Sequence, residues 1–155
     1  MVSDRFTILI DELGKAMGLN LKPDSNNACI SQYKDGLEVR LDPEPLGEMV
    51  YVWSDLGALP PTGKYRENIF KEALKANGLP PPKTGIFAFN SAKESLTLFE
   101  QLSIQDLTAI QLADFIETFA QRARIWKEGI TRGEIPSFQA TATSSSRGSG
   151  LFGLR

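Results

Sequence analysis

The chain has 155 residues, of which 41% are hydrophobic and 23% are charged, and its formal net charge is −2. This length suits one soluble domain with a sizeable core. Lys and Arg are scattered without a run of four, which argues against nucleic acid as a partner because phosphate binding needs clustered cations. The sequence has no apolar window of about 18 residues, so we expect no membrane insertion.

The residues that commonly carry chemistry are scarce. There is no histidine, which removes the commonest general base and metal ligand. The single cysteine, Cys29, can form no internal disulfide and fits a reducing cytoplasm. Asp11 and Glu12 interrupt the apolar N-terminus, so it does not resemble a signal peptide. The paired carboxylates Asp114 and Glu117 are interpreted as a solvated helix face. We therefore predict neither an enzyme nor a metal or cofactor site.

Apolar periodicity predicts the order α-β-β-β-α-β-β-α. The first helix is expected to begin with Ser3 as N-cap and to end at Gly18. The third is expected to begin at a capping box of Ser103 and Asp106 and to fray after Trp126. The expected helices cover residues 3–18, 63–77 and 104–126, and the expected strands cover residues 28–33, 37–42, 48–56, 85–90 and 95–102.

The strand patterns indicate how the sheet is arranged. Residues 37–42 alternate apolar and polar, as in a strand with one face in water. Residues 48–56 are apolar at both parities, which predicts a central strand. We therefore expect an α+β sandwich in which helices pack on a twisted antiparallel sheet. Residues 1–135 are expected to form this domain, and the Ser- and Gly-rich residues 136–155 are predicted to be a flexible tail.

The chain has more large apolar residues than one small core needs. A well-filled core is the simplest explanation for each residue alone. Taken together, the surplus suggests a homodimer, a binding groove, or both.

The segments GIFAFN…ESLTLFEQL, at residues 85–102, and FIETFAQRARIW, at 115–126, carry a resemblance to a known family. With the pattern L-x-L-F-E-Q-L-S-I-x-D-L, they resemble the last strands and C-terminal helix of the Tir chaperone family, the class I type III secretion chaperones of the CesT and SycE type. The likeness spans residues 3–130. The Ser- and Gly-rich tail departs from the family pattern.

The resemblance implies a cytoplasmic homodimer without a cofactor. It implies that the chain binds the N-terminal region of one or more secreted effectors, keeps them soluble and export-competent, and has the export apparatus as a further partner. The effector is expected to wrap the dimer in extended form and to add a strand to a sheet edge. The implied effector-binding residues are Phe6, Ile10, Leu13, Val39, Leu41 and Val50, and the implied dimer-interface residues are Ile69, Phe70, Leu74, Ile86, Phe87 and Phe89.

A competing hypothesis belongs to another class of protein. The surplus apolar residues could line a small-molecule pocket in a regulatory or ligand-binding α+β domain. A hydrolase ranks lower because the sequence offers no histidine base.

Overall fold

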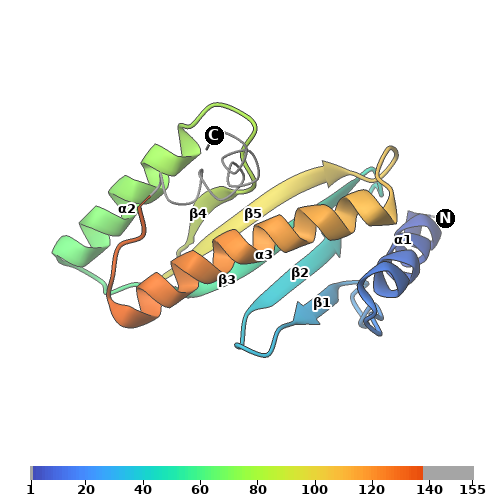
Figure 1. Cartoon of the computed structure of the whole chain (residues 1–155), viewed down its shortest axis with the longest axis horizontal. Helices are drawn as coiled ribbons and strands as arrows, with labels where there is room; N and C mark the ends of the chain where they lie inside the picture. The colour runs from blue at the N-terminus through green and yellow to red at the C-terminus, as the bar shows by residue number, and fades with distance from the viewer. Residues whose placement is uncertain (1, 138–155) are drawn as a thin grey trace, which may run out of the picture.

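The computed structural model describes residues 2–137, with side chains from Arg5 onward (Figure 1). Within this part of the chain, the element order α-β-β-β-α-β-β-α confirms the prediction. The helices are α1 (Val2–Met17), α2 (Lys64–Asn77) and α3 (Ala109–Arg132). The strands are β1 (Cys29–Gln32), β2 (Glu38–Pro43), β3 (Met49–Ala58), β4 (Ile86–Asn90) and β5 (Ser95–Ser103).

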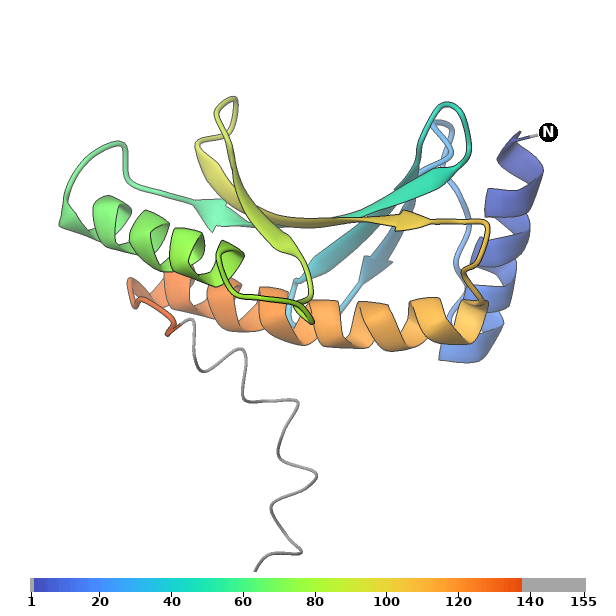
Figure 2. The same cartoon turned by 90° about the horizontal axis from the view of Figure 1, so that it is seen from above.

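The five strands form one antiparallel sheet in the order β1-β2-β3-β5-β4. β3 is the central strand, as its apolar residues at both parities predicted. Figure 2 shows a strongly curved sheet with α3 along one face and α1 and α2 towards its two ends. The other face of the sheet is covered by no described helix, and we call it the open sheet face.

The two parities of β3 lie on these two faces. Val50, Val52 and Leu56 point towards α3 and are fully buried. Tyr51 and Trp53 lie between them in sequence and are only half-buried, because they point to the open sheet face. The side chains of Val50, Val52 and Leu56 therefore belong to the core, while those of Tyr51 and Trp53 belong to the surface of the open sheet face.

The core lies between the sheet and one stripe of α3. Trp126 is fully buried and its ring centroid lies 4.2 Å from that of Phe87 on β4. Replacing a buried aromatic residue by alanine typically costs roughly 3–5 kcal/mol, so this contact is a large part of a domain's net stability. The buried residues of α3 are Leu112, Ile116, Phe119, Ala120, Arg122, Ala123, Trp126 and Gly129.

Both ends of α3 differ from the sequence prediction. Its N-cap is Thr108, whose hydroxyl accepts a bond from the N–H of Gln111, while the Gln111 side chain accepts one from the N–H of Thr108. The predicted cap at Ser103 is wrong because Ser103 still pairs with Met49 of β3. The expected fraying after Trp126 is also wrong: α3 continues to Arg132.

A glycine in the last turns of α3 lets the following segment pack closely against the helix. A Cβ at Gly129 would lie 2.7 Å from Cγ of Pro136, so only glycine lets the chain fold back against the last turns. Gly133 then ends the helix with a left-handed φ of 68°. At the other end of the domain, α1 begins at Val2, so Ser3 is not its N-cap, whereas Gly18 ends it as predicted.

The predicted boundary between domain and tail stays a prediction, because residues 138–155 lie outside the described residues. None of the helices in residues 2–137 is long and apolar enough to cross a bilayer.

The capping assignment can be tested by a pair of substitutions. Thr108→Ala removes the cap that satisfies a helix N–H, so we expect the free energy of unfolding to fall by about 1 kcal/mol. Ser103→Ala, at an exposed strand end, should change it by less than about 0.5 kcal/mol. Urea denaturation of both variants measures the difference. A larger loss for Ser103→Ala would return the cap to the position predicted from sequence.

Candidate binding surfaces

The described residues contain no group of three or more His, Cys, Asp or Glu side chains able to hold a metal ion. Three features of the molecular surface stand out: a row of large side chains on the open sheet face, an exposed patch where α2 meets β4, and the two edges of the sheet.

One row of side chains crosses all five strands on the open sheet face. The strand register places Ile30 beside Arg40, Arg40 beside Trp53, Trp53 beside Phe99, and Phe99 beside Ile86. Residues paired in this way on adjacent strands share a face and touch through their side chains. We call Ile30, Arg40, Trp53, Phe99 and Ile86 the central row.

The central row is partly exposed along its whole length. Ile30 and Ile86, on the two edge strands, are 39% and 37% exposed, and the three members between them are half-buried. Four of its five members are apolar, and the fifth, Arg40, is paired with Asp42. Partly exposed apolar side chains gathered in this way are typical of a surface that receives a partner.

Asp42 fixes the orientation of Trp53 in the central row. Its carboxylate accepts a hydrogen bond from the indole N–H of Trp53 and two from Nε of Arg40, both at 3.1 Å. The Arg40 guanidinium carbon lies 5.6 Å from the Trp53 ring centroid. Because the indole N–H is already bonded, Trp53 can offer its apolar surface to a partner without an unpaired donor.

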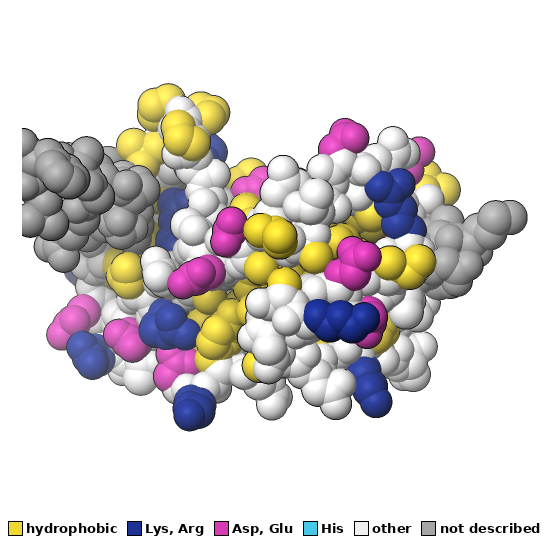
Figure 3. All heavy atoms as spheres, turned by 45° about the vertical axis from the view of Figure 1, so that its right-hand side comes forward, with side chains coloured by type: hydrophobic (Ala, Val, Ile, Leu, Met, Phe, Trp, Pro, Cys, Tyr) yellow, Lys and Arg dark blue, Asp and Glu magenta, His cyan; other side chains and the backbone are white. Residues whose placement is uncertain are grey.

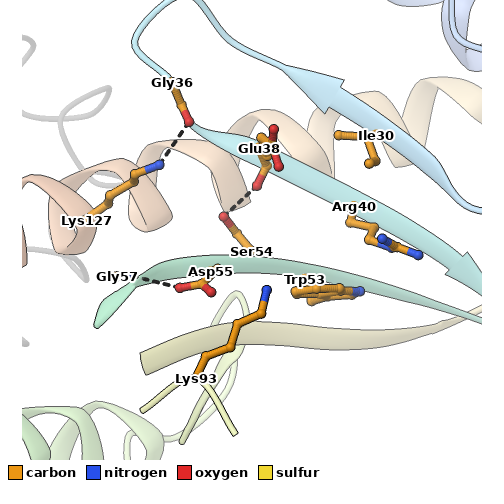
Figure 4. A pocket seen from close by; sticks show the side chains of 10 residues that line it. All are labelled: Ile30, Gly36, Glu38, Arg40, Trp53, Ser54, Asp55, Gly57, Lys93 and Lys127. Carbon is orange, nitrogen blue, oxygen red and sulfur yellow. Dashed lines mark hydrogen bonds between the residues drawn. The ribbon is translucent and has the colours of Figure 1, made fainter. Parts of the chain in front are cut away.

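A hollow of about 280 Å³ adjoins this tryptophan (Figure 4). Besides Ile30, Arg40 and Trp53, its lining includes carboxylates from Glu38 and Asp55. Figure 4 also shows Lys93 reaching over it from the β4–β5 turn. The lining of the hollow therefore combines apolar side chains with charged groups of both signs.

A buried arginine holds the segment that leads to Ile86. Arg122 of α3 donates to the carbonyl oxygens of Thr84 and Gly85, and Glu100 accepts from the Gly85 N–H at 2.8 Å. Burial lowers the pKa of Arg122, against the opposing effect of the Glu100 charge. These contacts fix where β4 begins, and so fix the last member of the central row.

A second exposed patch lies where α2 meets β4. Phe70 and Phe89 form an edge-to-face pair with ring centroids 5.3 Å apart. The guanidinium of Arg66 lies 5.1 Å from the first ring centroid and 4.8 Å from the second. Leu74, one turn further along α2, is 70% exposed. We call Arg66, Phe70, Leu74 and Phe89 the α2–β4 patch.

The six residues predicted to form the dimer interface lie in three different places in the structure. Phe70, Leu74 and Phe89 belong to the α2–β4 patch, and Ile86 belongs to the central row. Ile69 and Phe87 are core residues, 0% and 5% exposed.

The six residues predicted to bind an effector all lie in the core. None is more than 1% exposed, so the expected groove surface is not present at these positions. The alternation of β2 and β3 fixed which residues share a face, but the packing of α3 decided that this face is the buried one. The six residues are Phe6, Ile10, Leu13, Val39, Leu41 and Val50.

The two edges of the sheet differ in their free main-chain groups. On β4, the side-chain amide of Asn77 accepts from the Phe87 N–H at 2.8 Å and donates to its carbonyl at 2.9 Å. At Phe87 this amide takes the place of a neighbouring strand and occupies the outward main-chain groups of that residue. On β1, the Tyr33 N–H donates to Leu37, so the alternation of an antiparallel pair turns the main-chain groups of Ile30 and Gln32 outward. β1 is thus the edge open to a further strand.

Comparison with known proteins agrees with this architecture. Residues 8–127 match the Tir chaperone protein (CesT) family, so the chain belongs to that family. It is a type III secretion effector chaperone by class, which confirms the resemblance found in the sequence. The competing hypothesis of a ligand-binding regulatory domain is not supported. No curated protein matches the sequence.

Solved structures share the fold at low sequence identity. The type III secretion chaperone SycH of Yersinia pestis, in complex with a fragment of YscM2, has a TM-score of 0.61 and 20% identity over 77% of this chain and 97% of its own. The ExsC–ExsE complex has a TM-score of 0.62 and 15% identity, and the match covers 83% of this chain and 95% of the other. ExoU–SpcU, a heterodimeric complex from Pseudomonas aeruginosa, has a TM-score of 0.61 and 14% identity, and the match covers 79% of this chain and 98% of the other.

Sequence reasoning missed Arg40, Asp42, Trp53 and Phe99. The apolar second parity of β3 could have found Trp53, but it was used only to place that strand at the centre and to count a surplus of apolar residues. Arg40, Asp42 and Phe99 lie on other strands, so only the strand register brings them beside Trp53.

The occupied edge of β4 leads to a stability prediction. Asn77→Leu leaves both main-chain groups of Phe87 without their partner, so we expect unfolding free energy to fall by roughly 1–3 kcal/mol. Asn77→Asp keeps an acceptor for the N–H but loses the donor, and should fall between wild type and Asn77→Leu. Chemical denaturation measures all three. Equal stability of Asn77→Leu and wild type would show that the amide does not protect this edge.

Proposed function

We propose that the chain binds the N-terminal region of one or more secreted effectors in the cytoplasm, keeps them soluble and export-competent, and acts as a homodimer. The observation that carries this proposal is the central row, which reaches from one edge of the sheet to the other and is apolar except at Arg40. The export apparatus is its further partner in this proposal.

The dimensions of the central row indicate what it can receive. Five strands about 4.8 Å apart give a row of roughly 19 Å, the length of about 13 helical residues. An amphipathic effector segment laid along the row would cover Ile30, Trp53, Phe99 and Ile86. Each Å² of apolar surface removed from water contributes about 25 cal/mol, which favours partners that present a matching apolar face.

An extended part of the effector would add to the sheet at β1. The outward main-chain groups of Ile30 and Gln32 support this edge, whereas the Asn77 amide argues against β4. Strand addition supplies hydrogen bonds irrespective of side chain, and the central row then supplies the selectivity. Ile30 belongs to both features, so one effector could use them continuously.

The α2–β4 patch supports the homodimer. Aromatic side chains with a nearby arginine are typical of the centres of protein interfaces. Two copies joined here would cover Leu74, Phe70 and Phe89 and leave each open sheet face accessible.

Effector binding can be separated from folding by two substitutions in the central row. The native effector is first identified by co-purification and then produced with the chaperone. Ile30→Asp and Trp53→Ala should each weaken capture by at least about tenfold, because a charge or a void replaces an apolar contact. Both variants should keep the wild-type circular dichroism spectrum.

Two further variants serve as controls. Ile110→Asp changes an equally apolar residue that is 70% exposed on α3 and should leave capture unchanged. Leu41→Asp introduces a charge into the core and should unfold the chain. Undiminished capture by folded Ile30→Asp and Trp53→Ala would place the effector elsewhere.

The homodimer can be tested by light scattering. Wild type at micromolar concentration should show twice the 17.1 kDa mass of one chain. Phe89→Asp places a charge in the α2–β4 patch and should give the single-chain mass, while Ile110→Asp should remain dimeric. A wild-type protein that stays monomeric at high concentration would contradict this interface and the homodimer together.

A further inference from the structure

A separate groove lies on the helix side of the sheet, beside the free edge of β1. Its volume is about 480 Å³. It is bounded by the C-terminal end of α1, the middle of α3 and the residue that follows β1. Its lining includes Met17, Tyr33, Ala113, Asp114, Glu117 and Ala120, and we call this the α1–α3 groove. None of them was among the residues predicted to bind an effector.

The floor of the α1–α3 groove is apolar. Ala120 is buried, and Met17, Tyr33 and Ala113 are half-buried. In the space-filling view of Figure 3, which brings the α1 side of the molecule forward, hydrophobic side chains are exposed between carboxylates and basic groups. The groove can therefore take an apolar side chain or the aliphatic part of a long one.

The rim of the groove is acidic. Asp114 and Glu117 are exposed, and neither has an ion pair within the described part of the chain. Arg124 is the cation of this lining, but it donates to Asp35 and lies 5.3 Å over the Tyr33 ring. The positive charge is thus already paired, and the two carboxylates remain for a partner. Burial, with the charges of Glu117 and Asp35, raises the pKa of Tyr33 and keeps its hydroxyl neutral.

The position of the groove relates it to the edge of the sheet. Cys29 and Ser31 of β1 are buried on the helix side, and Tyr33 continues the same parity. A strand added to β1 would likewise turn every second side chain to the helix side. That side chain would face the α1–α3 groove, while its neighbours would face the open sheet face beside Ile30.

We propose that the α1–α3 groove receives alternate side chains of an extended effector segment paired with β1, and that Asp114 and Glu117 select segments in which those side chains are lysine or arginine. The aliphatic stem packs on Met17 and Tyr33, and the cationic end reaches the carboxylates. An acidic segment is disfavoured because it brings like charges together. The inference rests on the proposed function for its partner and for strand addition at β1, but not on the central row.

The test uses two short peptides as probes: one alternates valine with lysine, and the other alternates valine with glutamate. We expect the lysine peptide to bind wild type about tenfold more tightly than the glutamate peptide, because only the lysine peptide forms two partly exposed ion pairs with the groove. The preference should shrink as salt is added. The amide signals of Ile30 and Gln32 should shift on binding, which reports pairing at β1.

Charge variants decide whether the groove sets the preference. Asp114→Asn with Glu117→Gln should abolish it, and Asp114→Lys with Glu117→Lys should reverse it. As a control, Glu48→Lys with Glu134→Lys changes the net charge by as much as Asp114→Lys with Glu117→Lys. It does so at exposed positions away from the groove and should leave the preference in place. Both groove variants alter exposed side chains, and an amide spectrum confirms that they are folded.

The outcomes separate this inference from the proposed function. Failure of both peptides to bind, equal binding of both, or a preference that survives reversal at residues 114 and 117 would each overturn the inference. The central row is tested by different variants, Ile30→Asp and Trp53→Ala, with the native effector. Loss of effector capture in those variants together with no charge preference would retain the proposed function and reject the acidic selectivity.

Discussion

The packing of α3 against one face of the sheet is the contact on which the rest of the structure depends. A helix of 24 residues runs along the sheet and buries a stripe that includes Phe119 and Trp126. Its length, about 36 Å, lets one element cover strands from both halves of the chain. The opposite face is left without a described helix. This single asymmetry gives the domain a core on one side of the sheet and a partly exposed face on the other, where we propose that the effector binds.

Hydrogen bonds hold side chains of the open sheet face in fixed positions. Asp42 accepts hydrogen bonds from both Arg40 and Trp53, so the indole of Trp53 is held by polar bonds and faces its surroundings with apolar atoms. Arg122 and Glu100 hold the start of β4 and with it Ile86. A preorganised apolar row loses little conformational entropy when a partner binds, which favours affinity for segments that are themselves unfolded.

The edges of the sheet divide two further tasks in the proposed function. Asn77 occupies main-chain groups of β4, so that edge meets a partner through the side chains of the α2–β4 patch. β1 keeps the outward main-chain groups of Ile30 and Gln32, and the α1–α3 groove lies beside it. In this proposal the main chain of an extended effector pairs with β1, and its apolar side chains contact the central row. Its basic side chains contact Asp114 and Glu117.

The sequence by itself determined the element order, the central place of β3 and the family, because apolar periodicity and the 85–126 pattern are local signals. It could not decide which face of each strand is buried, since alternation relates residues only to one another; Val39, Leu41 and Val50 were therefore assigned to a surface and proved to be core. The cap of α3 was misplaced for a similar reason, because a register contact with Met49 keeps Ser103 in β5. Only the tertiary structure brought Ile30, Arg40, Trp53, Phe99 and Ile86 into one row, because strand order and register join residues that lie far apart in the chain.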